Sequence, residues 1–397
     1  MDVSAVRKRF PALQHHEQIF MDNAGGTQTL GTVIDSVVNY IKLNNAQIGA
    51  TYPVARSSIK LIEDGWQAAA KYINADRSEV VFGASTTQLL RNLSSSLHDH
   101  VQPGDEIIVS VLDHEANIAP WVQLAQDRGA TLKWYKPKSK TNPLIESEAL
   151  SEMMSSRTKI VACTHVSNVL GSVNDIKSIA EVVHKTPGAL LCADGVAYAP
   201  HKLVDVKELG VDFYSFSWYK LFGPHVATLY ASKTAQKYMR NIGQPYRATD
   251  SLEGLLSLAA ASYELVASIP DVCQFMSEIP WDLVSECEKK LQGILIDYLN
   301  SVPDKVQIWG QPVADTQKRI PVVSFTVHGR RSQDVVEVIQ GKSNIGFKWG
   351  SFLSVKLCED VLGLTEEDGV IRLSLAHYNT DDEVHMFVRL LDEVIKS

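Results

Sequence analysis

The chain has 397 residues, of which 45% are hydrophobic and 21% are charged, a composition that matches globular proteins and excludes disordered and fibrous ones. This length exceeds what one hydrophobic core usually serves, so we expect two domains. The formal net charge of -8 offers no attraction to phosphate backbones, and nucleic acid is therefore not expected as a partner.

Hydropathy and cysteine usage indicate the compartment. No run of about 18 uninterrupted apolar residues occurs, and the opening MDVSAVRKRF lacks the apolar stretch of a signal peptide. The five cysteines are odd in number and widely spaced, with no CxxC pair, which argues against a disulfide framework or a zinc site. We expect a cytoplasmic protein with reduced thiols, no membrane association and no bound metal.

Seven short apolar runs alternate with segments of helical period between residues 80 and 230. This alternation predicts an α/β fold with a mainly parallel, seven-stranded sheet. Runs such as ALLCAD are apolar without alternation, which is typical of strands covered by helices on both faces. The expected strands are Val80–Phe82, Glu106–Ser110, Thr131–Tyr135, Lys159–His165, Ala189–Asp194, Asp212–Ser217 and Ala227–Tyr230.

The pattern changes after Pro270. A long amphipathic stretch, three strand candidates and a closing helix predict a smaller α+β domain. No flexible linker separates it from the first domain, so we expect the two to pack together with a cleft between them. The large domain is expected at residues 16–265, and the small one at residues 1–15 and 266–397. The elements expected in the small domain are Trp281–Leu299, Val306–Trp309, Pro321–Val327, Ile371–Leu375 and Thr380–Ile395.

Lys220 and Asp194 stand where a parallel sheet binds its ligands, at or just after the carboxyl ends of predicted strands. Lys220 follows the run FYSFS on a predicted turn and can form a Schiff base with a carbonyl compound. A solvated turn lysine is the alternative. Asp194 can bind a metal, cap a helix or pair with a cation, and opposite a pyridinium nitrogen it would keep that nitrogen protonated.

Further polar residues follow other predicted strands. Ser85–Thr87 lie between the run VVF and a helical stretch at residues 88–97, an arrangement that suits an anion site, although any helix cap looks like this in sequence. His114 follows the run EIIVS, and His165 and Asn168 follow KIVACT. Each of these histidines could instead have a structural role in the core.

Taken in chain order, these segments resemble the class V aminotransferase family, fold type I enzymes that depend on pyridoxal 5'-phosphate and include the cysteine desulfurases. The resemblance covers nearly the whole chain and implies the fold type I transferase architecture, with a large and a small domain. It also implies a homodimer with the active site at the subunit interface. Six motifs carry it: MDNAGGTQTL, GASTTQLLRNLS, DHEANIAPW, THVSNVLGSVND, ADGVAYAPHKLVDVKELGVDFYSFSWYKLFGPH and GVIRLSLAHYNTDDEV.

The resemblance implies a role for each matching residue. Lys220 would hold the cofactor covalently, Asp194 would face its pyridine nitrogen and His114 would stack on its ring, and these three are the expected catalytic residues. Val196 would pack on the other face of the ring, and Asn168 would reach its phenolic oxygen. The remaining cofactor-binding residues are Thr86, Thr87 and Ser217 for the phosphate, Tyr219 in place of a phosphate-binding histidine, and Thr249 from the partner subunit.

The substrate side is implied in the same way. Arg372 would grip the α-carboxylate of a small amino acid through a bidentate fork. Desulfurases carry a nucleophilic cysteine in the loop that corresponds to residues 348–354, and Leu353 stands at that position here. Phe352 and Leu353 are expected to contact the substrate, and Cys358 is expected to be structural. These departures disfavour persulfide chemistry.

The motifs DGVAYAPH and SWYKLFGPH are most similar to those of a fungal secondary-metabolism subgroup that includes the decarboxylative aldolase of ustiloxin biosynthesis. This implies β-decarboxylation of aspartate, followed by enamine (aldol-type) bond formation to an aldehyde that gives a γ-hydroxy amino acid. Three alternatives stay open: a carbon–sulfur lyase, a ring-forming enzyme or epimerase, and a cofactor-free scaffold for partner binding. Residues 44–60 are expected to line the substrate pocket.

Overall fold

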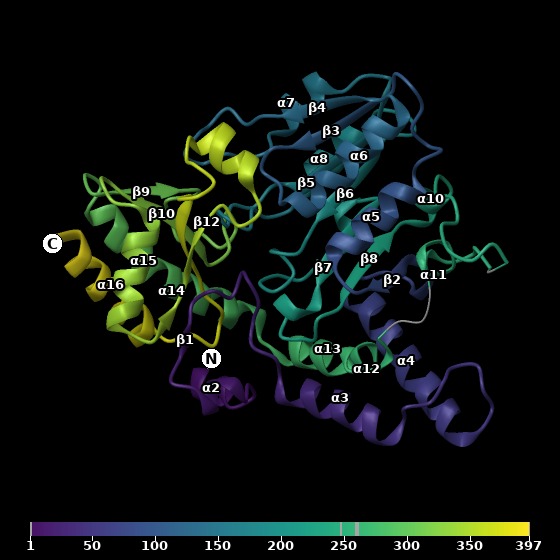
Figure 1. Ribbon diagram of the computed structural model, residues 1–397, viewed down its shortest axis with the longest axis horizontal. Coiled ribbons are helices and arrows are strands. Elements are labelled where there is room, and N and C mark those ends of the chain that lie inside the picture. The colour runs from purple at the N-terminus through teal and green to yellow at the C-terminus, as the bar shows by residue number, and fades with distance from the viewer. Residues whose placement is uncertain (1, 247, 259–261, 397) are drawn as a thin grey trace.

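The computed structural model describes residues 2–246, 248–258 and 262–396. In it the chain forms two bodies that lie side by side, each built around its own sheet (Figure 1). The sheet of the larger body has the strand order β2 (Val80–Gly83), β8 (Ala227–Ala231), β7 (Phe213–Ser217), β6 (Leu190–Asp194), β5 (Thr158–Thr164), β3 (Glu106–Ser110) and β4 (Thr131–Tyr135).

Strand direction in this sheet is mainly parallel. β7, β6, β5, β3 and β4 pair in parallel, whereas β8 runs antiparallel to both of its neighbours. The predicted α/β fold with a mainly parallel seven-stranded sheet is therefore confirmed. The register pairs Thr164 with Asp194 and Asp194 with Ser215, which brings the carboxyl ends of β5, β6 and β7 to one edge of the sheet.

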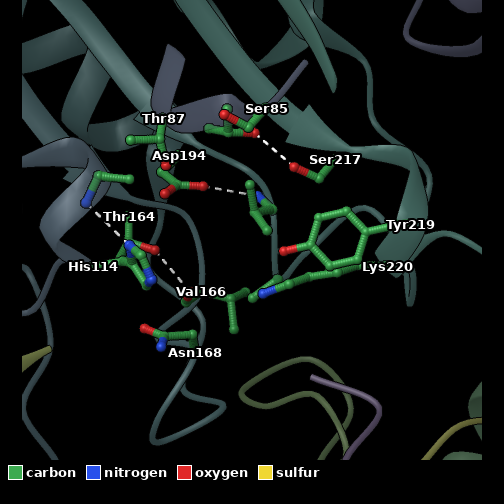
Figure 2. A pocket seen from close by; sticks show the side chains of 14 residues that line it. Ser85, Thr87, His114, Thr164, Val166, Asn168, Asp194, Ser217, Tyr219 and Lys220 are labelled. Atoms are coloured by element: carbon green, nitrogen blue, oxygen red, sulfur yellow. Dashed lines mark hydrogen bonds between the residues drawn. The ribbon is translucent and has the colours of Figure 1, made fainter. Parts of the chain in front are cut away.

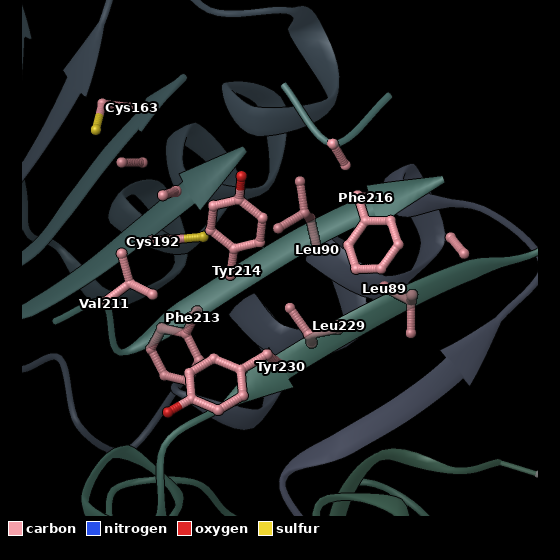
Figure 3. Close-up of a cluster of buried hydrophobic side chains, with 14 of the residues drawn as sticks. Leu89, Leu90, Cys163, Cys192, Val211, Phe213, Tyr214, Phe216, Leu229 and Tyr230 are labelled. Carbon is pink, nitrogen blue, oxygen red and sulfur yellow. The ribbon is translucent and has the colours of Figure 1, made fainter. Parts of the chain in front are cut away.

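Burial explains why the strand sequences lack polar alternation. Every residue of β3, β6, β7 and β8 is buried, and because successive side chains point to opposite faces, both faces must be covered. α5 (Thr86–Ser96) packs against β7 and β8, where Leu89 and Leu90 lie in one hydrophobic cluster with Phe216 and Leu229 (Figure 3). No helix in the described ranges combines the length and the apolarity needed to cross a bilayer.

The other helices between residues 31 and 278 surround the same body. They are α3 (Gly31–Leu43), α4 (Pro53–Tyr72), α6 (Ala119–Arg128), α7 (Ser147–Met153), α8 (Ile176–Val183), α9 (Val206–Leu209), α10 (Lys233–Gln236), α11 (Leu252–Leu256), α12 (Tyr263–Val266) and α13 (Ile269–Glu278). Two short helices, α1 (Val3–Arg7) and α2 (Ala12–His15), precede them.

The smaller body contains a four-stranded antiparallel sheet and three long helices. The strand order is β12 (Lys348–Gly350), β13 (Val370–Ser374), β10 (Val322–Val327) and β9 (Val306–Trp309), and the helices are α14 (Trp281–Ser301), α15 (Ser332–Lys342) and α16 (Asp381–Lys396). The sequence pattern therefore placed a second, α+β body correctly, although it did not identify α15 or the short strand β12.

The chain passes between the two bodies more than once. β1 (Ile19–Phe20) pairs in parallel with β11 (Ile345–Gly346), and Met21 lies in the hydrophobic core of the smaller body. α13 packs against α3 and α4. Within α14, Val284 belongs to the core of the larger body and Leu291 to that of the smaller one. Packed segments, rather than one linker, therefore join the bodies.

Candidate active site

A cavity lies at the carboxyl ends of the parallel strands (Figure 2). This is the edge at which open α/β sheets bind ligands. The cavity lining includes every predicted cofactor contact except Thr249. The lining residues are Ser85, Thr86, Thr87, His114, Ala116, Thr164, Val166, Asn168, Asp194, Val196, Ala197, Ser217, Tyr219 and Lys220.

One end of the cavity is lined by hydroxyl groups at the start of α5. The Ser85 side chain caps this helix by accepting the N–H of Gln88 at 3.1 Å. The Thr86 hydroxyl forms a 2.8 Å hydrogen bond with the Ser217 hydroxyl at the end of β7. The first N–H groups of a helix lack intrahelical partners and carry the positive end of the helix dipole. This end of the cavity therefore fits a phosphate group.

Asp194 is the last residue of β6 and is 5% exposed. Its carboxylate accepts the N–H of Val196 at 2.9 Å, and among the described residues no cation lies close enough to form an ion pair with it. Burial raises its pKa, while the Val196 N–H and the charge of Lys220 act in the opposite direction. A buried carboxylate without a cation is costly, so a protonated ring nitrogen would be a favourable partner.

Lys220 lies on the turn η3 (Trp218–Lys220), directly after β7, and its amino group reaches into the cavity (Figure 2). Burial lowers its pKa to about 8, helped by the charge of Arg372 and opposed by Asp194 and Asp22. At neutral pH a larger fraction of this lysine is uncharged than for an exposed lysine. An uncharged amine is the form that attacks a carbonyl carbon.

His114 lies on the wall of the cavity opposite Lys220 (Figure 2). Burial lowers its pKa to about 4, with further contributions from the charges of Lys220 and Arg372. The ring is therefore neutral at pH 7. Its Nδ1 accepts the N–H of Ala116 at 3.0 Å, so the single ring proton must sit on Nε2. His114 can thus donate a hydrogen bond from Nε2.

Asn168 joins the cavity to a loop of the smaller body. Its side-chain amide donates to the carbonyl of Phe352 at 3.0 Å, and its carbonyl accepts the Ser354 hydroxyl at 3.0 Å. One amide hydrogen stays available for the predicted contact with the phenolic oxygen of the cofactor. Tyr219 points into the cavity from the other side, and its ring stacks on His225 with 4.7 Å between centroids.

The three predicted substrate residues adjoin the cavity but do not line it. Arg372, on β13, is 3% exposed and donates to the backbone carbonyl of Asn168 at 3.0 Å. Its guanidinium lies 3.7 Å from the centroid of the Phe352 ring. Leu353 is 61% exposed, and its carbonyl accepts the N–H of Glu115 at 2.7 Å. Phe352 and Leu353 both adopt positive φ angles, of 53° and 57°.

Other sequence candidates lie elsewhere. Thr249 is exposed in the stretch before α11, so its contact with the phosphate of a partner subunit stays a prediction. His165 is buried, stacks on Tyr198 and hydrogen-bonds Tyr214, which is a structural role. All five cysteines fall in the described part of the chain, and none of them lines the cavity.

Sequence reasoning missed one charged residue of the site. Asp22 forms a 2.6 Å ion pair with Arg372. Its position in the motif MDNAGG, two residues after β1, was a possible signal, because polar residues near strand ends were the ones to weigh. Ala116, Thr164 and Val166 also line the cavity, but neither their chemistry nor their spacing distinguishes them in the sequence.

Comparison with known proteins identifies the family. The sequence profile of the family described as aminotransferase class-V matches residues 19–387. The aminotransferase-like protein FGM3 of Gibberella zeae is 48% identical over 400 residues, which cover 99% of this chain and 98% of the relative. The cysteine desulfurase-like protein ustD of Aspergillus flavus is 38% identical over 401 residues, which cover 100% of this chain and 91% of the relative.

A solved structure agrees at the level of the fold. The cysteine desulfurase CsdA of Escherichia coli matches with a TM-score of 0.87 at 24% identity, covering 100% of this chain and 99% of that one. The profile spans most of the chain, and two relatives match the chain over nearly their full lengths. The chain therefore belongs to the class V aminotransferase family.

Proposed function

We propose that this protein is a pyridoxal-phosphate enzyme that removes the β-carboxylate of aspartate and joins the β-carbon to an aldehyde, giving a γ-hydroxy amino acid. Members of the family typically use this cofactor. The observation that carries the proposal is the buried Lys220 facing Asp194 in a cavity that contains no thiol. The resemblance of the motifs DGVAYAPH and SWYKLFGPH to the decarboxylative aldolase subgroup directs the choice of reaction.

The residues of the cavity fit the cofactor by charge. Thr86, Thr87 and Ser217 would hold the phosphate at the start of α5, and Asp194 would pair with the ring nitrogen. Lys220 would form the Schiff base. When bound, the cofactor supplies an electron sink for charge that develops on the attached amino acid.

The protein's own residues would then position the substrate and move its protons. Arg372 binds the α-carboxylate, which orients the substrate's α-carbon. The uncharged amino group of Lys220 accepts the proton from that carbon and donates it to a different atom of the bound substrate. His114 donates from Nε2 and, being neutral, adds no positive charge that would attract a second carboxylate.

The surroundings of the β-carboxylate favour its departure. Among the described residues that line the cavity, Lys220 and His114 are the only basic ones. A carboxylate that leaves water without gaining a cationic partner is destabilised, whereas carbon dioxide is not. Phe352 and Leu353 at the cavity margin would also keep water from the β-carbon. That carbon then attacks an aldehyde rather than taking a proton, which would give alanine.

Persulfide formation is not part of the proposal. Burial raises the pKa of Cys358 to about 12, and this residue is fully buried in the helical segment Leu357–Leu362, which follows the loop that contains Leu353. A carbon–sulfur lyase is the second candidate, because eliminating a thiol from a cysteine derivative needs Lys220 and Arg372 but no cysteine. The same geometry supports removal of the α-proton, the step with which both reactions begin.

The proposal includes a homodimer. α3 and the segment that follows it expose a set of large apolar side chains, which is unusual for a monomer surface. This surface includes part of residues 44–60, the segment expected to line the substrate pocket. Its exposed members are Ile34, Val38, Ile41, Leu43, Ile48, Tyr52, Val54 and Ile59. We expect a sedimentation experiment to give a molecular mass twice that of the monomer.

The decisive experiment follows the fate of labelled aspartate. We expect enzyme incubated with aspartate labelled in its β-carboxylate to release labelled carbon dioxide, and to form a γ-hydroxy amino acid when an aldehyde is present. Without aldehyde, alanine is the expected product. Retention of the label under both conditions, together with cleavage of a cysteine-derived sulfoxide, would assign the protein to the carbon–sulfur lyases.

A further inference from the structure

The ion pair between Asp22 and Arg372 connects two segments that are 350 residues apart in the chain. The guanidinium is almost fully buried, whereas the Asp22 side chain is 34% exposed. Arg372 also donates to the Asn168 carbonyl and stacks on Phe352, yet its Nε has no partner. The arginine therefore retains N–H groups for a second carboxylate while Asp22 stays bound.

Asp22 is held rigidly in this position. It bridges to Ser374 of β13, and the neighbouring Ala24 N–H donates to the Ser374 hydroxyl at 2.8 Å. The N–H of Gly25 closes a turn on the carbonyl of Asp22, and a Cβ at Gly25 would lie 2.9 Å from Oδ2 of Asp22. The glycine thus leaves room for the carboxylate, so its placement is built into the fold.

The charges of this pair set a condition on what can bind next to it. Asp22 already neutralises Arg372, so a bare carboxylate would bring an uncompensated negative charge into a largely buried site. An α-amino acid brings its α-carboxylate together with an ammonium group, and these two groups add no net charge beside Arg372. Oδ2 of Asp22 accepts no hydrogen bond from the described residues and can receive one from that ammonium.

We propose that Asp22 is a specificity-determining residue that makes the Arg372 subsite select zwitterionic amino acids over carboxylic acids without an ammonium group. This inference rests on the proposed binding of the α-carboxylate by Arg372. The position of Asp22 also suits a role next to the reacting amine, because the charge of Asp22 raises the pKa of Lys220 and that of Arg372 lowers it. The ammonium would thus be held near Lys220, whose place on the cofactor it would take after losing a proton.

The test uses two unreactive ligands of the same shape, N,N-dimethylglycine and 3-methylbutanoate. Both carry a carboxylate, only the first carries an ammonium, and neither can form a Schiff base. Their dissociation constants for the cofactor-loaded protein can be measured by ligand-observed NMR titration, without turnover. We expect the wild type to prefer dimethylglycine, and Asp22→Asn to reduce that preference about threefold to tenfold. Asp22→Glu, which keeps the charge, should retain it.

Asp392→Asn is the matched control, because Asp392 makes an ion pair with Lys396 on α16 and does not line the cavity. It should leave both constants unchanged. Equal binding of the two ligands by the wild type overturns the inference, as does a uniform loss in Asp22→Asn, which would mean that Asp22 only positions Arg372. If Arg372→Leu leaves carboxylate binding intact, the proposed function of Arg372 fails instead.

Discussion

The cofactor side and the substrate side of this site are assembled in different ways. Lys220, Asp194 and Thr86, on the cofactor side, each lie at or within three residues of the end of a strand in one sheet. Strand register therefore fixes their separations. On the substrate side, Arg372 and Asp22 come from distant segments that are joined by backbone hydrogen bonds to Ser374 and by an ion pair. The first side depends on one sheet, whereas the second belongs to the smaller body and meets the first where Arg372 donates to the Asn168 carbonyl.

Lys220→Ala should have the largest effect, because it removes the covalent anchor of the cofactor side. We expect the yellow colour of the bound cofactor to be lost and turnover to fall by about 10³-fold or more, since the lysine also moves the substrate proton. Visible absorption and product formation measure the two effects. Lys207→Ala, on the exposed helix α9, is the control. Full turnover in Lys220→Ala would refute the assignment.

Asp194→Asn tests the same side without removing the cofactor. The amide cannot supply the negative charge that keeps the ring nitrogen protonated, so we expect turnover to fall about a hundredfold while the protein stays yellow. Asp212→Asn, at the amino end of the neighbouring strand β7, should leave turnover unchanged. An unchanged rate in Asp194→Asn would mean that the carboxylate only fixes the backbone at Val196.

Arg372→Lys tests the substrate side. A lysine keeps the charge but cannot offer a planar fork, so KM for the amino acid should rise about 30-fold or more with a smaller change in kcat. The visible spectrum of the bound cofactor should not change, because the sheet positions Lys220 independently. Steady-state kinetics measure KM and kcat, and the visible spectrum shows whether the cofactor stays bound. Loss of the cofactor in this variant would show that the two sides are not independent.

A pH series measures how strongly the two sides are coupled. Only the uncharged form of Lys220 captures the cofactor, so the rate of colour recovery by cofactor-free protein should rise with pH through the Lys220 pKa of about 8 and then level off. The charge of Arg372 lowers this pKa and that of Asp22 raises it. Arg372→Leu should therefore move the profile to higher pH, and Asp22→Asn should move it to lower pH. Identical profiles would exclude this coupling.

Cys358→Ala should have the smallest effect on activity. The thiol is buried and does not line the cavity. We expect turnover to change less than about twofold, and the free energy of unfolding to fall by about 1 kcal/mol because a small cavity forms in the core. Denaturant unfolding measures the change in the free energy of unfolding, and product formation measures turnover. A complete loss of activity in a folded variant would revive thiol chemistry.

Local patterns predicted the larger body well. Uninterrupted apolar runs occur where strands are covered on both faces, and the residues at their carboxyl ends converge because parallel strands share one edge. His114, Asp194 and Lys220 could therefore be found from sequence. The structural role of His165 could not, because its contacts with Tyr198 and Tyr214 depend on packing between neighbouring segments.

The sequence by itself determined the strands of the larger sheet, the helix start at Ser85 and the positions of Asp194 and Lys220 at or just after strand ends, since these depend on periodicity and on residues close together in the chain. Only the tertiary structure decided that Asp22 faces Arg372 and that Asn168 holds the loop at Phe352. These contacts join segments more than 180 residues apart. Their geometry follows from contacts between distant segments, which no local pattern encodes.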